Sequence, residues 1–168
     1  MRIAVTGNSK LAAAIRDRFN ALSFRVEDQI DKSNFDIFVN NAHVGFKQCE
    51  LLYDWYEEWK HDKSKLIINI SSRAGLPNLS KGFLYAAQKA ALDHLSDNLI
   101  YNSDKLCRIT SINLGMLEDS LPSVSYKETC DLIEYIIRLP VHLEIPRIFL
   151  QNSHNYKDIQ SMKIIANK

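Results

Sequence analysis

The sequence is poor in the features that mark a disulfide scaffold, a metal centre or a membrane protein. It has three cysteines, Cys49, Cys107 and Cys130, and none forms a CxxC pair. An odd and widely spaced set fits a reducing compartment better than a disulfide framework. The five histidines lack an HxxxH motif or a His–Cys metal spacing, so we expect no bound metal. No segment approaches 18 consecutive apolar residues, so we expect no membrane span.

Charge of one sign is also scarce. The chain has 21 basic and 20 acidic residues, a net charge of +1 and no run of four basic residues. We therefore expect neither nucleic acid nor a membrane surface as a partner. The first residues lack the long apolar segment of a signal peptide, and a cytoplasmic location is expected.

What remains is ordinary material for a globular protein. The chain has 168 residues, of which 46% are apolar and 24% are charged. This length suits a single domain over residues 1–168, which would bury roughly 70% of the surface of its unfolded chain. A hydrophobic core can therefore form without disulfides or metals.

Short β-branched segments alternate with helix-length segments. Two of them, FDIFVNN and KLIINIS, are nearly continuous apolar runs, typical of parallel strands buried on both faces. The alternation predicts an α/β fold with a doubly wound parallel sheet of about six strands. The predicted strands are Arg2–Thr6, Ser23–Glu27, Asp36–Asn40, Lys65–Ser71, Arg108–Asn113 and Arg147–Gln151, and the predicted helices are Lys10–Leu22, Gln48–His61, Leu84–Asn102 and Tyr126–Leu139. The third helix is expected to pack through Ala86, Ala87, Ala90, Ala91, Leu95 and Leu99.

Small and polar residues follow four of the predicted strands. They read Thr6-Gly7, Asn40-Asn41-Ala42, Ser71-Ser72 and Asn113-Leu114-Gly115. The carboxyl ends of parallel strands meet at one edge of a sheet, where open α/β sheets bind ligands. The sequence therefore predicts a binding site that gathers these residues.

Tyr85 and Lys89 add a chemical signal. Residues four apart lie on one face of a helix, and an ammonium beside a phenol lowers the pKa of the phenol. Such a phenol can donate and accept protons nearer neutral pH. Ser72, thirteen residues before Tyr85, has a hydroxyl that could polarise a substrate carbonyl. A YxxxK pair alone is common on helices, so its significance here depends on the other motifs that accompany it in the sequence.

The order TG, NNA, ISS, YxxxK and NxG resembles the short-chain dehydrogenase/reductase family. The resemblance implies a Rossmann-type fold, a nicotinamide cofactor and interconversion of a carbonyl and an alcohol on a small substrate. It implies that Tyr85 is the general acid/base and that Ser72 orients the carbonyl. It gives Lys89 two tasks, which are to lower the phenol pKa and to bind the nicotinamide ribose. The fourth catalytic member of the family, an Asn, falls near Gln48.

The same resemblance indicates where the cofactor would lie. Its implied contacts are Gly7, Asn8, Ser9, Lys10, Leu11, Asn40, Ala42, Tyr85, Lys89 and Gly115. Backbone N–H groups after the first strand would receive the pyrophosphate. Lys10 in this loop slightly favours NADP(H) over NAD(H), and a solvated lysine is the alternative interpretation.

The glycine-rich loop departs from the family pattern TGxxxGxG. Read without a gap, its second and third glycine positions hold Leu11 and Ala13; with one residue deleted, the second glycine is missing and Ala12 takes the third position. Glycine at the second position lets the backbone approach the pyrophosphate, so a side chain there would interfere.

Length is a second departure. Fewer than ten residues lie between Glu27 and Asp36, too few for the helix and strand that the family places there. One βα unit that helps wall the adenine pocket is therefore expected to be absent. Glu27 or Asp28 is a candidate for the adenosine ribose or an ordinary turn residue. His43 replaces the family's glycine after NNA and is expected to narrow the cofactor groove.

Two functional hypotheses follow. One is an NAD(P)(H)-dependent oxidoreductase, and the other is a catalytically idle relative that binds a nucleotide or a protein partner as a regulator. Leu114 replaces the family's usual proline, and Met116–Lys127 leaves little chain for a substrate lid. Trp55, Tyr56 and Trp59 are interpreted as packing or as an oligomer contact, and we expect a homo-oligomer, a dimer or a tetramer.

Overall fold

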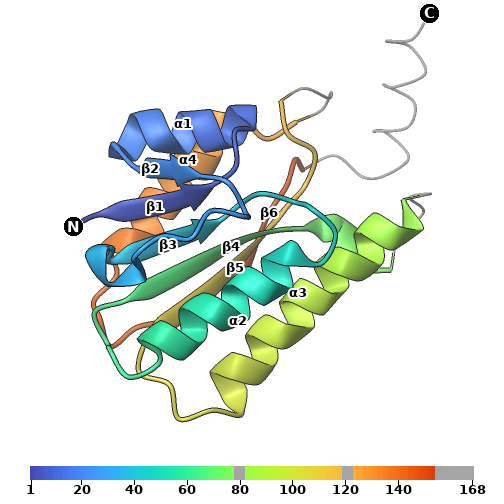
Figure 1. Ribbon diagram of the computed structural model, residues 1–168. Helices are drawn as coiled ribbons and strands as arrows, with labels where there is room; N and C mark the ends of the chain where they lie inside the picture. Colours follow the sequence, from blue (N-terminus) through green and yellow to red (C-terminus); the bar gives the residue numbers. More distant parts are fainter. Residues whose placement is uncertain (78–81, 119–122, 154–168) are drawn as a thin grey trace, which may run out of the picture.

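The computed structural model describes residues 1–77, 82–118 and 123–153, and these form a parallel sheet with helices on both faces (Figure 1). The six described strands run in the order β2-β1-β3-β4-β5-β6. Their bounds are Ile3–Thr6 (β1), Leu22–Phe24 (β2), Ile37–Asn40 (β3), Leu66–Ser72 (β4), Arg108–Leu114 (β5) and Arg147–Leu150 (β6). The helices are Lys10–Phe19 (α1), Lys47–Trp59 (α2), Phe83–Tyr101 (α3) and Tyr126–Arg138 (α4). The predicted fold class is confirmed.

Two hydrophobic cores lie on opposite faces of the sheet. In Figure 1, α1 and α4 cover one face and α2 and α3 cover the other. Successive side chains of β1 alternate between the cores, so Ile3 and Val5 pack with α1 and α4, and Ala4 packs with the other core. This burial on both faces explains why the strands read as continuous apolar runs.

The predicted absence of one βα unit is confirmed. After β2 the chain returns to β3 through a single 3₁₀ turn, Lys32–Asn34, and within the described ranges no strand lies beyond β2. Strand β2 is also shorter than predicted, because it ends at Phe24 and not at Glu27. The backbone N–H of Arg25 donates to Asp28 Oδ2 at 2.8 Å, and this turn ends the ladder.

The aromatic residues of α2 form part of the core. Trp55 stacks on Phe38 of β3, with ring centroids 4.1 Å apart and planes 9° from parallel, and Trp59 meets Trp55 edge-on at 4.6 Å. Tyr56 is buried as well. The interpretation of these residues as packing is confirmed, and their use as an oligomer surface was wrong because the sheet already covers them. The oligomeric state stays a prediction.

The buried face of α3 agrees only in part with the predicted one, because Leu99 is buried and Leu95 packs against the core, but polar residues share this face. Its buried residues are Gln88, Lys89, Leu92, Asp93, Ser96 and Leu99, whereas Ala87 is exposed. The helix turns polar groups inward because polar groups meet it there; Ser111 of β5, for example, donates to Ser96 Oγ at 3.0 Å. The predicted face was therefore right for the leucines and missed the polar residues that share it.

A close approach fixes α3 against the turn after β4. A Cβ on Gly75 would lie 3.1 Å from backbone atoms of Lys89 and Ala90. Such a spacing is tighter than side chains usually tolerate. Gly75 therefore sets the distance between the turn that follows Ser72 and the helix that carries Tyr85.

Candidate functional site

The strand-end residues gather at one edge of the sheet, as predicted. Thr6, Asn40 and Ser72 each end a strand, and Asn113 is one residue from the end of β5. All five neighbouring strand pairs are parallel, so these ends lie on the same side. The first turn of α3 lies at this edge too (Figure 1).

Two cavities meet along this edge. The larger, of about 850 Å³, lies over the ends of β1 and β2, and the smaller, of about 310 Å³, lies between β4 and α3. Ser9, Asn41 and His43 line both of them. The smaller cavity also contains Lys10, Leu11, Ser72, Tyr85, Lys89 and Gly115, and the larger one contains Gly7, Asn8, Arg25, Glu27, Asp28 and Ala42. Together they form an extended site, and Ser72, Tyr85 and Lys89 lie at the end formed by the smaller cavity.

The TG and NNA motifs are bonded to each other. Thr6 Oγ1 accepts hydrogen bonds from the backbone N–H groups of Asn41 and Ala42, at 2.9 and 3.0 Å, and the Asn41 amide donates to the Thr6 carbonyl at 3.1 Å. Gly7 has φ +90°, and a Cβ there would lie 2.9 Å from the Ala42 Cβ. Glycine is therefore required at this position by both conformation and space.

Two of the side chains that replace the family's glycines, those of Leu11 and Ala12, are buried in the core. Ser9 Oγ accepts from the Ala12 N–H at 3.2 Å and caps α1, which begins at Lys10. Leu11 is only 3% exposed, and it packs in the core with Ala12. The backbone at the start of α1 can therefore receive an anion, since helix N-termini bind phosphates.

Lys89 lies in a buried polar network beside the smaller cavity. Its ammonium donates to Gln48 Oε1 at 2.6 Å and to the Ile70 carbonyl at 2.8 Å. The Gln48 amide donates in turn to the Asn40 carbonyl at 2.8 Å, and Asn40 donates back to the Gln48 carbonyl. The extra methylene of Gln48 thus brings its amide oxygen directly to Lys89. Asn40 is fully buried and is not among the residues that line either cavity, so it supports Gln48 from below.

Burial changes the acidity of this lysine. It lowers the pKa of Lys89 to about 8, and the Asp93 carboxylate opposes that shift. Asp93 lies one helical turn further on and accepts from the Asn113 amide at 2.5 Å. Burial raises the pKa of Asp93 itself, whereas Ser71 and Asn113 lower it. Asp93 was not predicted, although its four-residue spacing from Lys89 indicated the shared helix face.

Tyr85 and Ser72 face the same small cavity. The Lys89 ammonium lies 5.7 Å from the centre of the Tyr85 ring. Ser72 Oγ accepts from the Ala74 N–H at 3.1 Å, which leaves its O–H able to donate to a ligand. The structure therefore brings together the three residues that the spacing singled out, with Gln48 behind them.

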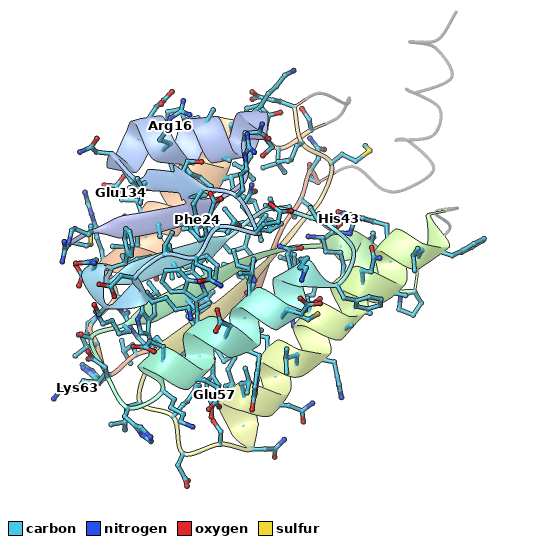
Figure 2. The ribbon with its side chains drawn as sticks, in the orientation of Figure 1. Arg16, Phe24, His43, Glu57, Lys63 and Glu134 are labelled. Atoms are coloured by element: carbon cyan, nitrogen blue, oxygen red, sulfur yellow. The ribbon has the colours of Figure 1, made fainter. Side chains whose placement is uncertain are left out.

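His43 lines both cavities, at the place where they meet. The sequence led us to expect it in this groove. Its Nε2 lies 2.7 Å from Gln88 Oε1, and its ring meets Tyr85 edge-on, with centroids 4.8 Å apart. Figure 2 labels His43 on the loop near the start of α3. His43 lies in the loop after β3, whereas Tyr85 and Gln88 are on α3, so sequence spacing could not predict these contacts.

The larger cavity contains one charged residue that was not predicted. Arg25 follows β2 directly and lines the larger cavity beside Glu27 and Asp28. The Asp28 carboxylate is engaged by the Arg25 N–H, which fits the turn interpretation of that residue. The position of Arg25 immediately after a predicted strand was the available signal.

At the other end, Gly115 has a packing reason of its own. A Cβ there would lie 2.9 Å from the Gln151 Cβ. Of the short segment Met116–Lys127, residues 119–122 lie outside the described residues. Within the described ranges no helix is long and apolar enough to cross a membrane, and no three side chains of the types that bind metals gather into a site.

Comparisons with known proteins agree on the fold. No family model and no curated protein matches the sequence. Solved structures do match: serine dehydrogenase from Escherichia coli has a TM-score of 0.69 and 18% identity, and the match covers 89% of this chain and 97% of that one. A 4-hydroxyisoleucine dehydrogenase mutant complexed with NADH and succinate gives 0.71 and 17%, covering 90% and 97%. The 3-alpha-hydroxysteroid dehydrogenase from Pseudomonas sp. B-0831, complexed with NADH, gives 0.67 and 14%, covering 90% and 95%. The chain therefore has the fold of the short-chain dehydrogenases that its motifs resemble.

Proposed function

We propose that the protein is an NAD(P)(H)-dependent oxidoreductase of the short-chain dehydrogenase/reductase type, which interconverts a carbonyl and an alcohol on a small substrate. The observation that carries the proposal is Lys89, a buried lysine beside the ring of Tyr85 in a cavity that also contains Ser72. Burying an ammonium is costly, and perturbed titratable groups in a cleft are typical of catalytic sites. The dehydrogenase neighbours support the same chemistry.

The residues present fit a nicotinamide dinucleotide. The positive φ at Gly7 and the start of α1 suit the pyrophosphate, and the larger cavity suits the adenosine half. Lys89, which lines the smaller cavity, would hold the nicotinamide ribose. When bound, the cofactor would supply or accept the hydride at the substrate carbon. The chain itself would supply the proton and hold the carbonyl.

Each catalytic residue has one task in carbonyl reduction. The Ser72 O–H donates to the carbonyl oxygen and polarises it. Tyr85 gives its phenolic proton to the oxygen as negative charge develops there. The Lys89 ammonium stabilises the phenolate that remains, and Gln48 holds the ammonium in place. Alcohol oxidation runs the same transfers in reverse.

A specific observation favours the regulatory alternative, because β2 is the edge of the described sheet and the adenosine cavity lacks the family's outer wall. The test that separates the two is oxidation of NADPH, followed by its absorbance, with a panel of small aldehydes and ketones. The oxidoreductase proposal expects turnover with some members of the panel. Nucleotide binding without turnover on any carbonyl or alcohol would favour the regulator.

We further propose a preference for NADP(H). Arg25 and Lys10 line the two cavities along the path of the cofactor, and either can pair with a phosphate. We expect Arg25→Ala to weaken NADPH binding by about tenfold and NADH binding by less than about twofold, with a similar but smaller effect for Lys10→Ala. Fluorescence titration with both cofactors measures this. Arg16→Ala, at an exposed arginine outside both cavities, is the control. Equal or tighter binding of NADH by the unmodified protein would contradict the preference.

A further inference from the structure

The first turn of α3 carries the proposed catalytic phenol, and within the described residues no side-chain cap bond is found at its start. Its N-cap residue is Gly82, which has no side chain to cap the helix. The next two residues, Phe83 and Leu84, are 77% and 67% exposed, and Tyr85 is 39% exposed. Helix starts tend to fray, so a contact from another element would steady the phenol.

His43 supplies such a contact from a different element. Its ring meets the Tyr85 ring edge-on at 4.8 Å, and its Nε2 lies 2.7 Å from Gln88 Oε1. The amide oxygen of Gln88 can only accept, so Nε2 carries the hydrogen in this arrangement. Gln88 is three residues after Tyr85 and therefore lies on the same side of the helix. One imidazole thus contacts both Tyr85 and Gln88 near the start of α3.

The loop that carries His43 is itself held to the sheet. The preceding residue, Ala42, donates its backbone N–H to Thr6 Oγ1 at 3.0 Å. Asn41 is bonded to Thr6 in the same way and also reaches Ser9 Oγ at 3.2 Å. The imidazole therefore connects the first turn of α3 to the end of β1 through a short series of hydrogen bonds.

We propose that His43 is a positioning residue that holds Tyr85 in its catalytic orientation. This rests on the proposed function for its effect on turnover, but its effect on α3 is independent of catalysis. A glycine, which the family pattern has at this place, could make neither contact. The imidazole also lies at the junction of the two cavities, so the phenol is fixed next to the path of the cofactor.

The first test is His43→Gly, with two readouts. Amide hydrogen exchange at Ala86, whose N–H donates to the Gly82 carbonyl, and at the residues that follow it in α3 should become about five- to tenfold faster without any ligand, as expected for loss of one modest hydrogen bond and a ring contact. In the same variant kcat should fall by roughly tenfold while NADPH affinity changes by less than about threefold. His43→Phe keeps the ring contact and should lie between the two. His142→Gly, at an exposed histidine in a distant turn, should change neither readout.

A double-mutant cycle tests whether His43 acts through Gln88. Gln88→Leu should lower kcat and speed exchange in the original protein, but it should add little in the His43→Gly background. If the effects of the two substitutions are independent and additive, His43 does not act through Gln88, and this part of the proposal fails. A loss of NADPH affinity with unchanged kcat in His43→Gly would overturn the positioning role.

The readouts also separate this inference from the proposed function. If the protein never turns over a carbonyl, the oxidoreductase proposal fails and the exchange measurement alone decides the role of His43. Unchanged exchange in α3 of His43→Gly would then overturn the inference. If the protein is active but His43→Gly keeps its kcat within about twofold, the inference fails and the proposed function stands.

Discussion

Tyr85→Phe should lower turnover by about 10²–10⁴-fold, because it removes the proton that the developing alkoxide needs in the transition state. The substitution deletes one hydroxyl from a side chain that is partly exposed, so the fold and the cofactor site should remain. NADPH affinity should therefore stay within a few-fold. Steady-state turnover and fluorescence titration of the two proteins measure both quantities.

Ser72→Ala is the companion variant. It removes the O–H that polarises the carbonyl but leaves the phenol in place, so turnover should fall without unfolding the protein. Undiminished turnover in Tyr85→Phe, on any substrate that the protein uses, would contradict the assigned roles even though the fold is right. The regulatory alternative predicts nucleotide or partner binding that is insensitive to Tyr85→Phe.

Lys89→Met should damage both turnover and cofactor affinity, because the ammonium is assigned to the phenol and to the ribose. It should also change how stability depends on pH. Burial lowers the pKa of Lys89 to about 8, below the value of about 10.4 for an unfolded lysine. Between these values the unfolded state binds more protons than the folded state, so folding becomes more favourable as pH rises.

The size of this effect follows from the shift. Below pH 8 the folded protein carries the full penalty of a buried charge, and by about pH 10.4 the penalty is relieved by roughly 3 kcal/mol. Urea unfolding of the original protein and of Lys89→Met, at pH 7 and pH 10, gives the comparison. From pH 7 to pH 10, the free energy of unfolding of the original protein should rise relative to that of the variant. A difference that does not change with pH would show that Lys89 titrates as an exposed lysine.

Much of the fold was visible in the sequence. Parallel strands buried on both faces must be apolar throughout, so FDIFVNN and KLIINIS predicted β3 and β4 within one residue. The short distance from Glu27 to Asp36 was too small for a crossover and predicted the absent unit. The end of β2 was misplaced, because a local hydrogen bond between Arg25 and Asp28 decides it.

Contacts between distant elements were the part that could not be predicted. The helical period identified Trp55 and its neighbours as one face of α2, but it does not say whether that face meets the sheet or another chain. The period also gave no hint that α3 turns Asp93 and Ser96 inward, since polar residues are buried only where partners meet them. The bond from His43 to Gln88 joins residues 45 positions apart.

In the candidate site, too, local sequence patterns were predictive and contacts between distant residues were not. The spacing of Ser72, Tyr85 and Lys89 predicted their convergence, because each stands at a strand end or on a shared helix face. The glycine loop was harder to interpret, since a missing glycine indicates a blocked phosphate site only if its replacement points outward. Leu11 points into the core, so the loss of glycine costs less than the sequence indicated.

Titration of the purified protein with NADPH, with nicotinamide fluorescence as the signal, tests the central claim most directly. The claim requires a hydride donor beside Tyr85, and Lys89 and the Gly7 loop are the groups proposed to hold it. We expect saturable binding at cofactor concentrations below about 1 mM, and weaker binding by Lys89→Met. An absence of saturable binding of either NADPH or NADH in that range would contradict the account, because the phenol would then have no hydride transfer to complete.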